Sequence, residues 1–295
     1  MKVGFIGIGS MGAPMAANIL AAGHQLMVYD LNLSVTADLE QAGAQRSEDV
    51  VSLVRGSDVV IMSLPGPIEV DEVVVQILPS MSPGQVLIDM STNSPEKVKQ
   101  IAVKATSAGV GFLDAPVSGG VRGATKGTLS IMVGGEKELF DEFGVLFSAL
   151  GKNIFYAGEV GSGNVAKLVN NSLAFSIMMA NAEALVLGVK AGVDSTVLWN
   201  IVRTSSGNSL TWEGGVKAIL KDRLPTAFTV DLACKDINLA TKLADEVGVD
   251  LTMVPMAKQI LENFQSNGFA QEDILATVKY LEERNKVMVR GTWED

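Results

Sequence analysis

The spacing of apolar positions changes once along the chain, near residue 160. Before that point, short runs such as VGFIGI (3–8) and DVVIMSL (58–64) are apolar at nearly every position. Runs of this length and composition are typical of strands buried on both faces of a parallel sheet. The predicted strands are 3–8, 26–30, 58–64, 85–90, 111–114, 128–133 and 153–156, and the predicted helices between them are 11–22, 34–41, 47–55, 68–78, 94–108 and 136–149.

Beyond Gly163 the apolar spacing is helical and strand-like runs are absent. Helices are predicted at 164–191, 195–203, 209–221, 230–247, 253–266 and 271–288. The pattern therefore predicts an α/β domain with a mostly parallel sheet over 1–162, then an all-helical domain over 163–295, joined by a long helix. The length of 295 residues agrees with two domains, at roughly 150 residues each.

Composition narrows the classes of function. Apolar residues make up 47% of the chain and charged residues 19%, which is enough for a large core. The net charge is −10 and no run of Lys or Arg occurs, so nucleic acid and anionic membranes are poor partners. An acidic enzyme can still bind an anionic substrate, provided that it carries a local positive site.

The chain has one cysteine and one histidine, which removes much of the possible chemistry. Cys234 alone cannot form an internal disulfide, and this fits a reducing compartment. His24 falls in a predicted helix-to-strand turn, where we expect a solvated side chain. No cluster of metal ligands is visible, so we expect no metal, and proton transfer must rest on Lys, Tyr, Asp or Glu.

Two apolar stretches invite a membrane interpretation. The N-terminal stretch is interrupted by Gly4, Gly7, Gly9 and Pro14, which break a signal-peptide helix. The stretch 173–191 contains Asn, Glu and Lys, so we expect a helix buried in protein rather than a membrane span. The sequence therefore predicts a soluble cytoplasmic protein.

The loop after the first strand carries Gly7-x-Gly9-x-x-Gly12. The motif is weak alone, but here it follows a strand and opens a helix, as a dinucleotide-binding loop must. Gly7 permits a tight turn, Gly9 lets backbone approach a pyrophosphate, and Gly12 allows the helix to pack on the strand. N–H groups at the helix start then face the phosphates. The predicted cofactor residues of this loop are Gly7, Gly9, Ser10, Met11 and Gly12.

Asp30 ends the next predicted strand, close to the spacing expected of an acid that binds the adenosine ribose. Its carboxylate would accept hydrogen bonds from both ribose hydroxyls and would repel a 2′-phosphate. Residues 31–34 offer no Arg or Lys for such a phosphate, so NAD is favoured over NADP. The competing interpretation is a tight turn with an exposed Asp.

Two further loops, SLPGP (63–67) and MSTNSP (90–95), follow strands of the same predicted sheet. Ligands bind outside the carboxyl ends of such strands, so these loops are candidates for the rest of the cofactor site. Thr92 offers a hydroxyl, whereas Ser94 and Pro95 equally predict a helix start.

A second glycine loop, Ser118-Gly119-Gly120, follows the strand that ends before Pro116. Successive backbone N–H groups here would form a concavity for an anion, and a substrate carboxylate has the right size. The alternative is a loop that needs positive φ at two positions. Arg122 lies just beyond and fits either a surface cation or a specificity role.

Asn164, Lys167 and Asn171 are spaced so that they share one face of the long predicted helix. Lys167 fits three roles: a chain reaching solvent, a partner of a carboxylate, or a proton-transfer group in a cleft. A buried polar cluster needs polar partners, and a substrate hydroxyl and carboxylate would supply them. Without a suitable histidine, Lys167 is the best general acid/base available, and burial disfavours the charged form of lysine, as that role requires.

Four motifs occur in a fixed order: GFIGIGSMGAPMAANIL, DAPVSGG, GSGNVAKLVNN and DLACKDINLA. Together they resemble the β-hydroxyacid dehydrogenase family over essentially the whole chain. The resemblance implies a Rossmann domain followed by a helical substrate and oligomerisation domain, and an NAD-dependent reaction between a short 3-hydroxy or 4-hydroxy acid and its semialdehyde. It also implies a homodimer or homotetramer.

The resemblance assigns roles to single residues. It implies that Lys167 is catalytic, that Asn171 helps to hold the substrate, and that Ser118, Gly119 and Gly120 bind its carboxylate. Further cofactor contacts that it implies are Leu64, Pro65, Thr92 and Lys235.

Related families fit the motifs less well. 6-Phosphogluconate dehydrogenase has a similar plan, but Asn170 and Ala174 stand where it carries a His and an acid, which disfavours decarboxylation. Imine-reducing relatives replace the lysine. A non-catalytic dinucleotide-binding sensor or scaffold remains the alternative, and the sequence does not choose among the candidate semialdehydes.

Overall fold

The strands of the first half pair into one sheet because their apolar residues are buried on both sides. The computed structural model describes residues 1–224 and 228–291. The strands are β1 Lys2–Ile6, β2 Gln25–Tyr29, β3 Gln45–Arg46, β4 Val59–Met62, β5 Val86–Asp89, β6 Gly111–Asp114, β7 Val117–Ser118, β8 Leu129–Gly135 and β9 Gly151–Gly158. Every residue of β4 and β5 is buried, as the continuous apolar runs predict.

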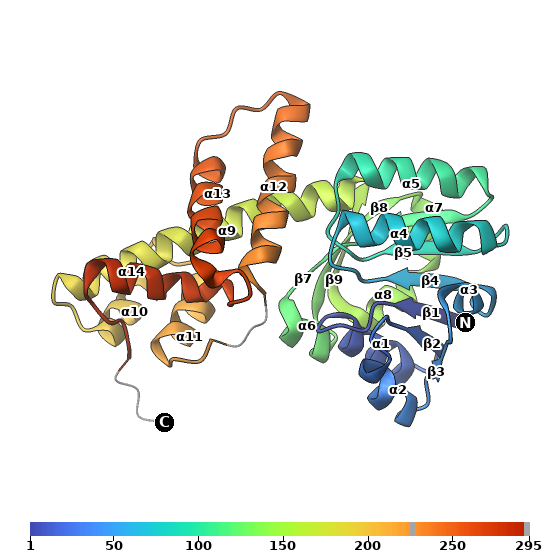
Figure 1. Cartoon of the computed structure of the whole chain (residues 1–295), viewed down its shortest axis with the longest axis horizontal. Helices are drawn as coiled ribbons and strands as arrows, with labels where there is room; N and C mark the ends of the chain where they lie inside the picture. The colour runs from blue at the N-terminus through green and yellow to red at the C-terminus, as the bar shows by residue number, and fades with distance from the viewer. Residues whose placement is uncertain (225–227, 292–295) are drawn as a thin grey trace. The chain divides into compact units, whose positions relative to one another are not determined.

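The sheet has the order β3-β2-β1-β4-β5-β6-β8-β7, with β9 paired to β8 (Figure 1). The strands from β3 to β6 are parallel, β8 is antiparallel to β6 and β7, and β9 is parallel to β8. The predicted mostly parallel sheet is therefore confirmed. Since the strand order reverses between β1 and β4, the carboxyl ends of these strands form the switch point where ligands of such sheets bind.

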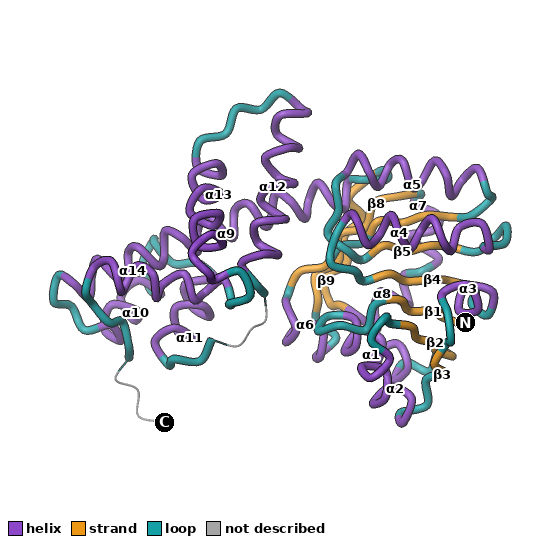
Figure 2. The backbone as a smooth tube through the Cα atoms, viewed as in Figure 1, coloured by secondary structure: helices purple, strands orange, loops and turns teal. Residues whose placement is uncertain are grey.

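Helices cover both faces of this sheet (Figure 2). They are α1 Gly12–Ala21, α2 Ala37–Gln41, α3 Val50–Arg55, α4 Pro67–Ile77, α5 Pro95–Ser107, α6 Gly120–Lys126, α7 Lys137–Glu142 and α8 Gly144–Leu150, with short 3-10 turns at Leu33–Thr36 and Leu78–Ser80. Two clusters of buried apolar residues form the core of this unit. In one, α1 and α8 pack against the sheet, and in the other, α3, α4 and α5 do. The helix predicted at 136–149 is interrupted at Phe143, so it forms two helices.

The second half is helical, as predicted. It contains α9 Ser162–Lys190, α10 Ser195–Arg203, α11 Lys217–Leu220, α12 Val230–Val247, α13 Met253–Phe264 and α14 Thr277–Asn285, with π-helical turns at Trp212–Val216 and Gln265–Phe269 and a 3-10 turn at Ile274–Ala276. Thr229 is the N-cap of α12, and its hydroxyl accepts the N–H of Leu232. Gly248, with φ 71°, is the C-cap.

The chain divides into two compact units, Met1–Leu168 and Val169–Asp295. Their boundary lies within α9, so the first turns of this helix belong to the α/β unit. Two apolar clusters form the core of the helical unit. One joins α9 to α12 and α13, and the other surrounds Trp199 and Trp212.

Candidate active site

The first glycine loop joins β1 to α1, and its three glycines meet different constraints. Gly7 has φ 93° and donates its N–H to the carbonyl of Tyr29 at 3.0 Å. A Cβ on Gly12 would lie 1.8 Å from the carbonyl oxygen of Gly7, so no larger residue fits there. A Cβ on Gly9 would meet nothing within 4 Å. The space beside Gly9 is therefore open to a ligand.

Asp30 stands at the carboxyl end of β2, directly beside this loop. Its Oδ2 accepts the N–H of Ile8 at 2.7 Å and its Oδ1 accepts the N–H of Asn32 at 2.8 Å. Each oxygen of a carboxylate has two acceptor positions, so both retain one for a ligand hydroxyl. The open glycine loop and this acid fit the phosphates and ribose of a dinucleotide.

The loops after β4 and β5 are joined by a hydrogen bond. The N–H of Leu64 donates to the hydroxyl of Ser91 at 2.9 Å, and Ser91 precedes Thr92. The two loops predicted to contact the cofactor are thus held to each other, with Pro65 continuing the first.

Two buried acids, Asp89 and Asp114, end β5 and β6. Burial raises the pKa of Asp89 to about 6, against hydrogen bonds from Ser91 and Asn93 that lower it, and the charge of Asp114 adds to the rise. Burial also raises the pKa of Asp114, while hydrogen bonds from Gly161 and Asn164 oppose that rise. Sequence reasoning missed both acids because they lie within apolar strand runs.

The second glycine loop has the backbone that two adjacent glycines favour. Ser118 ends β7, Gly119 has φ 130°, and Gly120 has φ 61° and begins α6. A Cβ on Gly120 would meet no atom within 4 Å, although the positive φ would strain it. Arg122 is exposed on α6.

The three polar residues at the start of α9 are all buried. Asn164 is 0% exposed, Lys167 8% and Asn171 6%. The three side chains predicted to share one face of a helix are therefore all buried, and Lys167 does not extend into solvent. Since Lys167 and Asn171 are four residues apart on one continuous helix, they lie one turn apart along it.

Within the helical unit, Asn171 and Lys235 share a partner that the sequence did not single out. The Nδ2 of Asn171 donates a hydrogen bond of 2.6 Å to Asp236 Oδ2. The ammonium of Lys235 lies 2.8 Å from Asp236 Oδ1. Asp236 Oδ1 is buried, and the Lys235 ammonium neutralises this carboxylate through an ion pair. Asp236 is adjacent to Lys235 in the CKD motif, which was the available signal.

Two expectations are corrected, those for α9 and for His24. α9 is not buried on all sides, because Leu173 is 61% exposed and Leu187 71%. Trp212 is a core residue, since it is 1% exposed and its indole N–H donates to the carbonyl of Trp199 at 3.2 Å. His24 lies in the expected turn but is partly buried, its Nε2 has no partner, and burial lowers its pKa.

α9 is also the one helix among residues 1–224 and 228–291 that is long and apolar enough to cross a membrane. Length and composition are weak indications, because core helices of soluble proteins meet the same criteria. Over the same residues, no group of three or more His, Cys, Asp and Glu side chains gathers as a metal site would.

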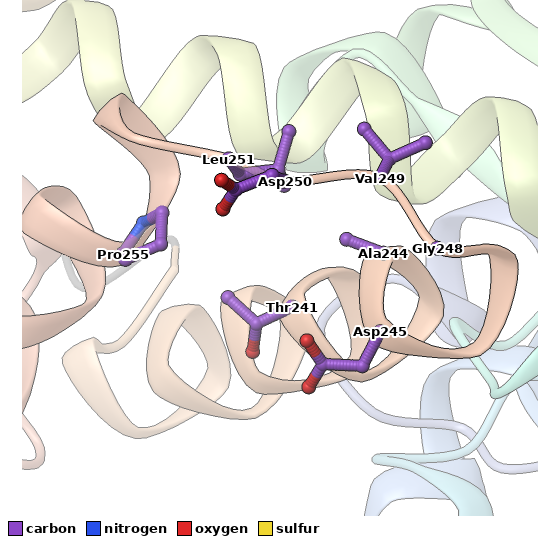
Figure 3. A pocket seen from close by; sticks show the side chains of 8 residues that line it. All are labelled: Thr241, Ala244, Asp245, Gly248, Val249, Asp250, Leu251 and Pro255. Atoms are coloured by element: carbon purple, nitrogen blue, oxygen red, sulfur yellow. The ribbon is translucent and has the colours of Figure 1, made fainter.

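A pocket of about 410 Å³ lies between the end of α12 and the start of α13 (Figure 3). Its lining consists of Thr241, Ala244, Asp245, Gly248, Val249, Asp250, Leu251 and Pro255. None of the predicted site residues is among them, and the carboxylates of Asp245 and Asp250 would repel an anionic substrate. This pocket is therefore not the candidate active site.

Comparisons with known proteins agree with this geometry. Residues 2–158 match the NAD-binding domain of 6-phosphogluconate dehydrogenase, and residues 161–281 match the NAD-binding domain of NADP-dependent 3-hydroxyisobutyrate dehydrogenase. The chain is 38% identical to 2-(hydroxymethyl)glutarate dehydrogenase of Eubacterium barkeri, over 99% of this chain and 98% of that enzyme. The chain belongs to the β-hydroxyacid dehydrogenase family.

Other members of the β-hydroxyacid dehydrogenase family are similar over nearly the full length. The NAD-dependent L-serine dehydrogenase of Pseudomonas aeruginosa is 37% identical over 94% of this chain and 97% of its own. A structure of Mycobacterium tuberculosis 3-hydroxyisobutyrate dehydrogenase with L-serine has a TM-score of 0.85 at 30% identity, covering 95% of this chain and 98% of that chain. Membership establishes an NAD(P)-binding oxidoreductase fold with homologues that act on hydroxy acids.

The pKa of Asp89 predicts how stability depends on pH. A carboxyl whose pKa rises from 3.8 to about 6 on folding stabilises the fold when protonated, and this contribution is lost as pH rises through 6. The parent should therefore lose about 1.4 kcal/mol of unfolding free energy through this group between pH 5 and pH 8, and Asp89→Asn should not. The stability of the variant relative to the parent should thus be higher at pH 8 than at pH 5 by that amount. Urea unfolding at both values measures this change.

Asp49→Asn is the matched control. Its side chain caps α3, and hydrogen bonds from Ser52 hold its pKa below 3.8, so its contribution is constant between pH 5 and pH 8. If Asp89→Asn differs from the parent by the same amount at both pH values, Asp89 is ionised throughout and the argument fails.

Proposed function

We propose that the protein is an NAD-dependent oxidoreductase that interconverts a short 3-hydroxy or 4-hydroxy acid and its semialdehyde, with Lys167 as general acid and base. The observation that carries the proposal is a lysine 8% exposed on α9, in a chain that aligns with hydroxyacid dehydrogenases over nearly its whole length. Burial disfavours the charged form of a lysine, as a group that takes up and releases a proton requires.

The cofactor residues in this proposal are Gly7, Gly9, Ser10, Met11, Gly12, Asp30, Leu64, Pro65, Thr92 and Lys235. The open space at Gly9 and the acceptor positions left on Asp30 support it. When bound, NAD supplies the hydride acceptor for oxidation and, as NADH, the donor for reduction. NAD rather than NADP is proposed because Asp30 would repel a 2′-phosphate and residues 31–34 carry no cation.

On the substrate side, Ser118 and the N–H groups of Gly119 and Gly120 hold the carboxylate and so orient the alcohol carbon. Lys167 as a neutral amine takes the hydroxyl proton during oxidation, and as an ammonium it returns a proton to the carbonyl oxygen during reduction. Asn171 hydrogen-bonds the substrate hydroxyl or the lysine. Its amide is oriented by Asp236 at 2.6 Å, which fixes the direction of its remaining donor.

The substrate class follows from the chemistry of the relatives. Three relatives are named for 2-(hydroxymethyl)glutarate, L-serine and 3-hydroxyisobutyrate. In each of these acids, a CH2OH group is bonded to the carbon that bears the carboxylate. Residues 205–211, the residues from Phe228 onward and Arg122 are the proposed sources of specificity among such acids. We also propose a cytoplasmic location, since this chemistry draws on the intracellular dinucleotide pool.

The alternative is a non-catalytic dinucleotide-binding sensor or scaffold. Such a protein needs the first glycine loop and Asp30, but it has no need for a buried lysine. Lys167, Asn171 and the Ser118 loop together therefore favour the enzyme.

A panel assay tests the proposed activity and the cofactor preference. We expect NADH oxidation, followed at 340 nm, with at least one of tartronate, methylmalonate and succinate semialdehydes. NADH should be preferred to NADPH by at least about tenfold in kcat/KM, a difference of about 1.4 kcal/mol. Tight NADH binding without turnover of any aldehyde would favour the sensor, and a preference for NADPH would reject the role of Asp30.

Lys167→Ala tests the proton-transfer role. Removal of a general acid/base should lower kcat by about 10²- to 10⁴-fold while the Kd of NADH, measured by fluorescence, stays within about threefold. Lys167→Arg should be equally impaired, because a guanidinium does not release its proton. Lys104→Ala, at an exposed position of α5, is the control and should retain parental kcat. Turnover of Lys167→Ala within a few-fold of the parent would reject the assignment.

We propose that the protein is a homodimer or homotetramer in which a neighbouring subunit covers one face of α9. Val165, Val169 and Leu173 are 38%, 60% and 61% exposed at four-residue spacing, so they form an apolar stripe along the helix. Contiguous apolar surface of this kind marks association sites.

Sedimentation velocity should therefore detect a species of at least two chains. Leu173→Glu places a charge in the stripe and should shift the distribution toward the monomer. Val75→Glu, at a 63% exposed apolar position of α4, serves as the control and should sediment as the parent does. A parent that sediments as a monomer at micromolar concentration would contradict the proposal.

A further inference from the structure

Asn164 is the buried amide at the start of α9 that has no role in the proposed reaction. It is 0% exposed and lies three residues before Lys167. Its Oδ1 accepts the N–H of Asn93 at 2.7 Å, and its Nδ2 donates to Asp114 Oδ2 at 3.1 Å. One side chain thus joins α9 to two segments, one 71 and one 50 residues away in sequence.

The Asp114 side of this link fixes the first turn of α9. Asp114 Oδ1 accepts the N–H of Gly161 at 2.8 Å, and Oδ2 also accepts the backbone N–H of Asn164 at 2.8 Å. These N–H groups lie at a helix start, where they have no partner within the helix. The carboxylate at the end of β6 therefore caps α9, just ahead of the strand that leads to Ser118.

Close backbone packing restricts where the Asp114 carboxylate can lie. A Cβ on Gly163 would lie 2.9 Å from Asp114 Oδ2, and a Cβ on Gly134 would lie 2.4 Å from Oδ1. Both neighbouring segments therefore need a glycine beside the carboxylate. Asp114 is thus a well-defined anchor at the end of β6, and the Asn164 amide connects this anchor to Asn93.

The Asn93 side leads to the loops predicted to hold the cofactor. Asn93 follows Thr92, and its Nδ2 lies 3.4 Å from Asp89 Oδ2. Asp89 Oδ1 accepts the N–H of Ser91, whose hydroxyl in turn accepts the N–H of Leu64. A continuous chain of hydrogen bonds therefore runs from Asn164 to the loops after β4 and β5.

We propose that Asn164 is a positioning residue, which holds Lys167 at a set place relative to the loops that carry Leu64, Thr92 and Ser118. The inference rests on the proposed function, because it concerns where the proton-transfer group stands relative to the hydride-transfer site. Misplacement of a reacting group by about 1 Å can cost on the order of a hundredfold in rate.

The chemistry of the link requires an amide. The position needs an acceptor facing the Asn93 N–H and a donor facing the Asp114 carboxylate, and an amide offers both on two separate atoms, whereas a hydroxyl offers both on one. An aspartate would set a second negative charge against Asp114, and a leucine would leave the buried groups on both sides unsatisfied.

Single-turnover kinetics test the proposal, using the semialdehyde of the panel that gives the highest kcat/KM. With NADH limiting, enzyme in excess over NADH and the semialdehyde saturating, each bound NADH reacts once. The rate constant of the fast phase then reports on positioning, and its amplitude reports on the fraction of NADH bound to competent enzyme. For Asn164→Ala we expect a rate constant lower by about tenfold to a hundredfold, with the amplitude and the Kd of NADH within about twofold of the parent.

Gln85→Ala is the matched control within the same α/β unit. The Gln85 amide also joins distant segments, with bonds of 2.8 Å and 2.5 Å to the carbonyls of Val54 and Ser57, but it lies at the amino end of β5. A loss of stability at this position should leave the rate constant unchanged. A parental rate constant with reduced amplitude for Asn164→Ala would show a purely structural role and overturn the proposal.

Two further variants make every outcome decisive. Should Asn164→Ala give no folded enzyme, the polar but shorter and uncharged Asn164→Ser is judged by the same rate constant. Lys167→Ala in the same experiment separates the two hypotheses. If Lys167→Ala retains the parental rate constant, the proposed function fails, and if it is inactive while both Asn164 variants react at the parental rate, only the positioning role fails.

Discussion

The constraint on which the α/β unit depends is the parallel pairing of strands that are buried on both faces. Parallel strands all run the same way, so the loops that follow β1, β2, β4, β5 and β6 leave from one edge of the sheet. Every candidate cofactor loop of this unit follows one of those strands. The buried strands form the core of the unit, and the loops at their carboxyl ends carry the candidate cofactor residues.

Polar groups at that edge are buried, which constrains them more strongly than exposure would. Asp89 and Asp114 end neighbouring strands, and burial raises the pKa of each. Buried acids without hydrogen-bond partners are costly. Asp89 accepts hydrogen bonds from Ser91 and Asn93, and Asp114 accepts them from Gly161 and Asn164. The donors come from the loop after β5, which is a candidate cofactor loop, and from the start of α9, which carries Lys167. Satisfying the acids therefore orders those segments.

The helical unit repeats this arrangement on a smaller scale. Asp236 is 1% exposed on α12, and it holds the Asn171 amide while its other oxygen faces the Lys235 ammonium. The sequence motifs indicate Asn171 and Lys235 as site residues, but they do not indicate the acid between them. A local pattern shows that a polar group is present, whereas its partner is recognised only when another helix is packed beside it.

The sequence by itself determined the elements of this protein and the residues whose meaning is local. Continuous apolar runs predicted the buried strands, the glycine spacing predicted the first loop, and the helical period placed Lys167 and Asn171 one turn apart, because each depends only on neighbours a few residues away. Tertiary structure alone decided that Asn164 joins Asp114 to Asn93, that Trp212 is core, and that one face of α9 is exposed. These features depend on contacts between segments tens of residues apart, and no spacing along the chain encodes which strand end or helix a buried side chain will meet.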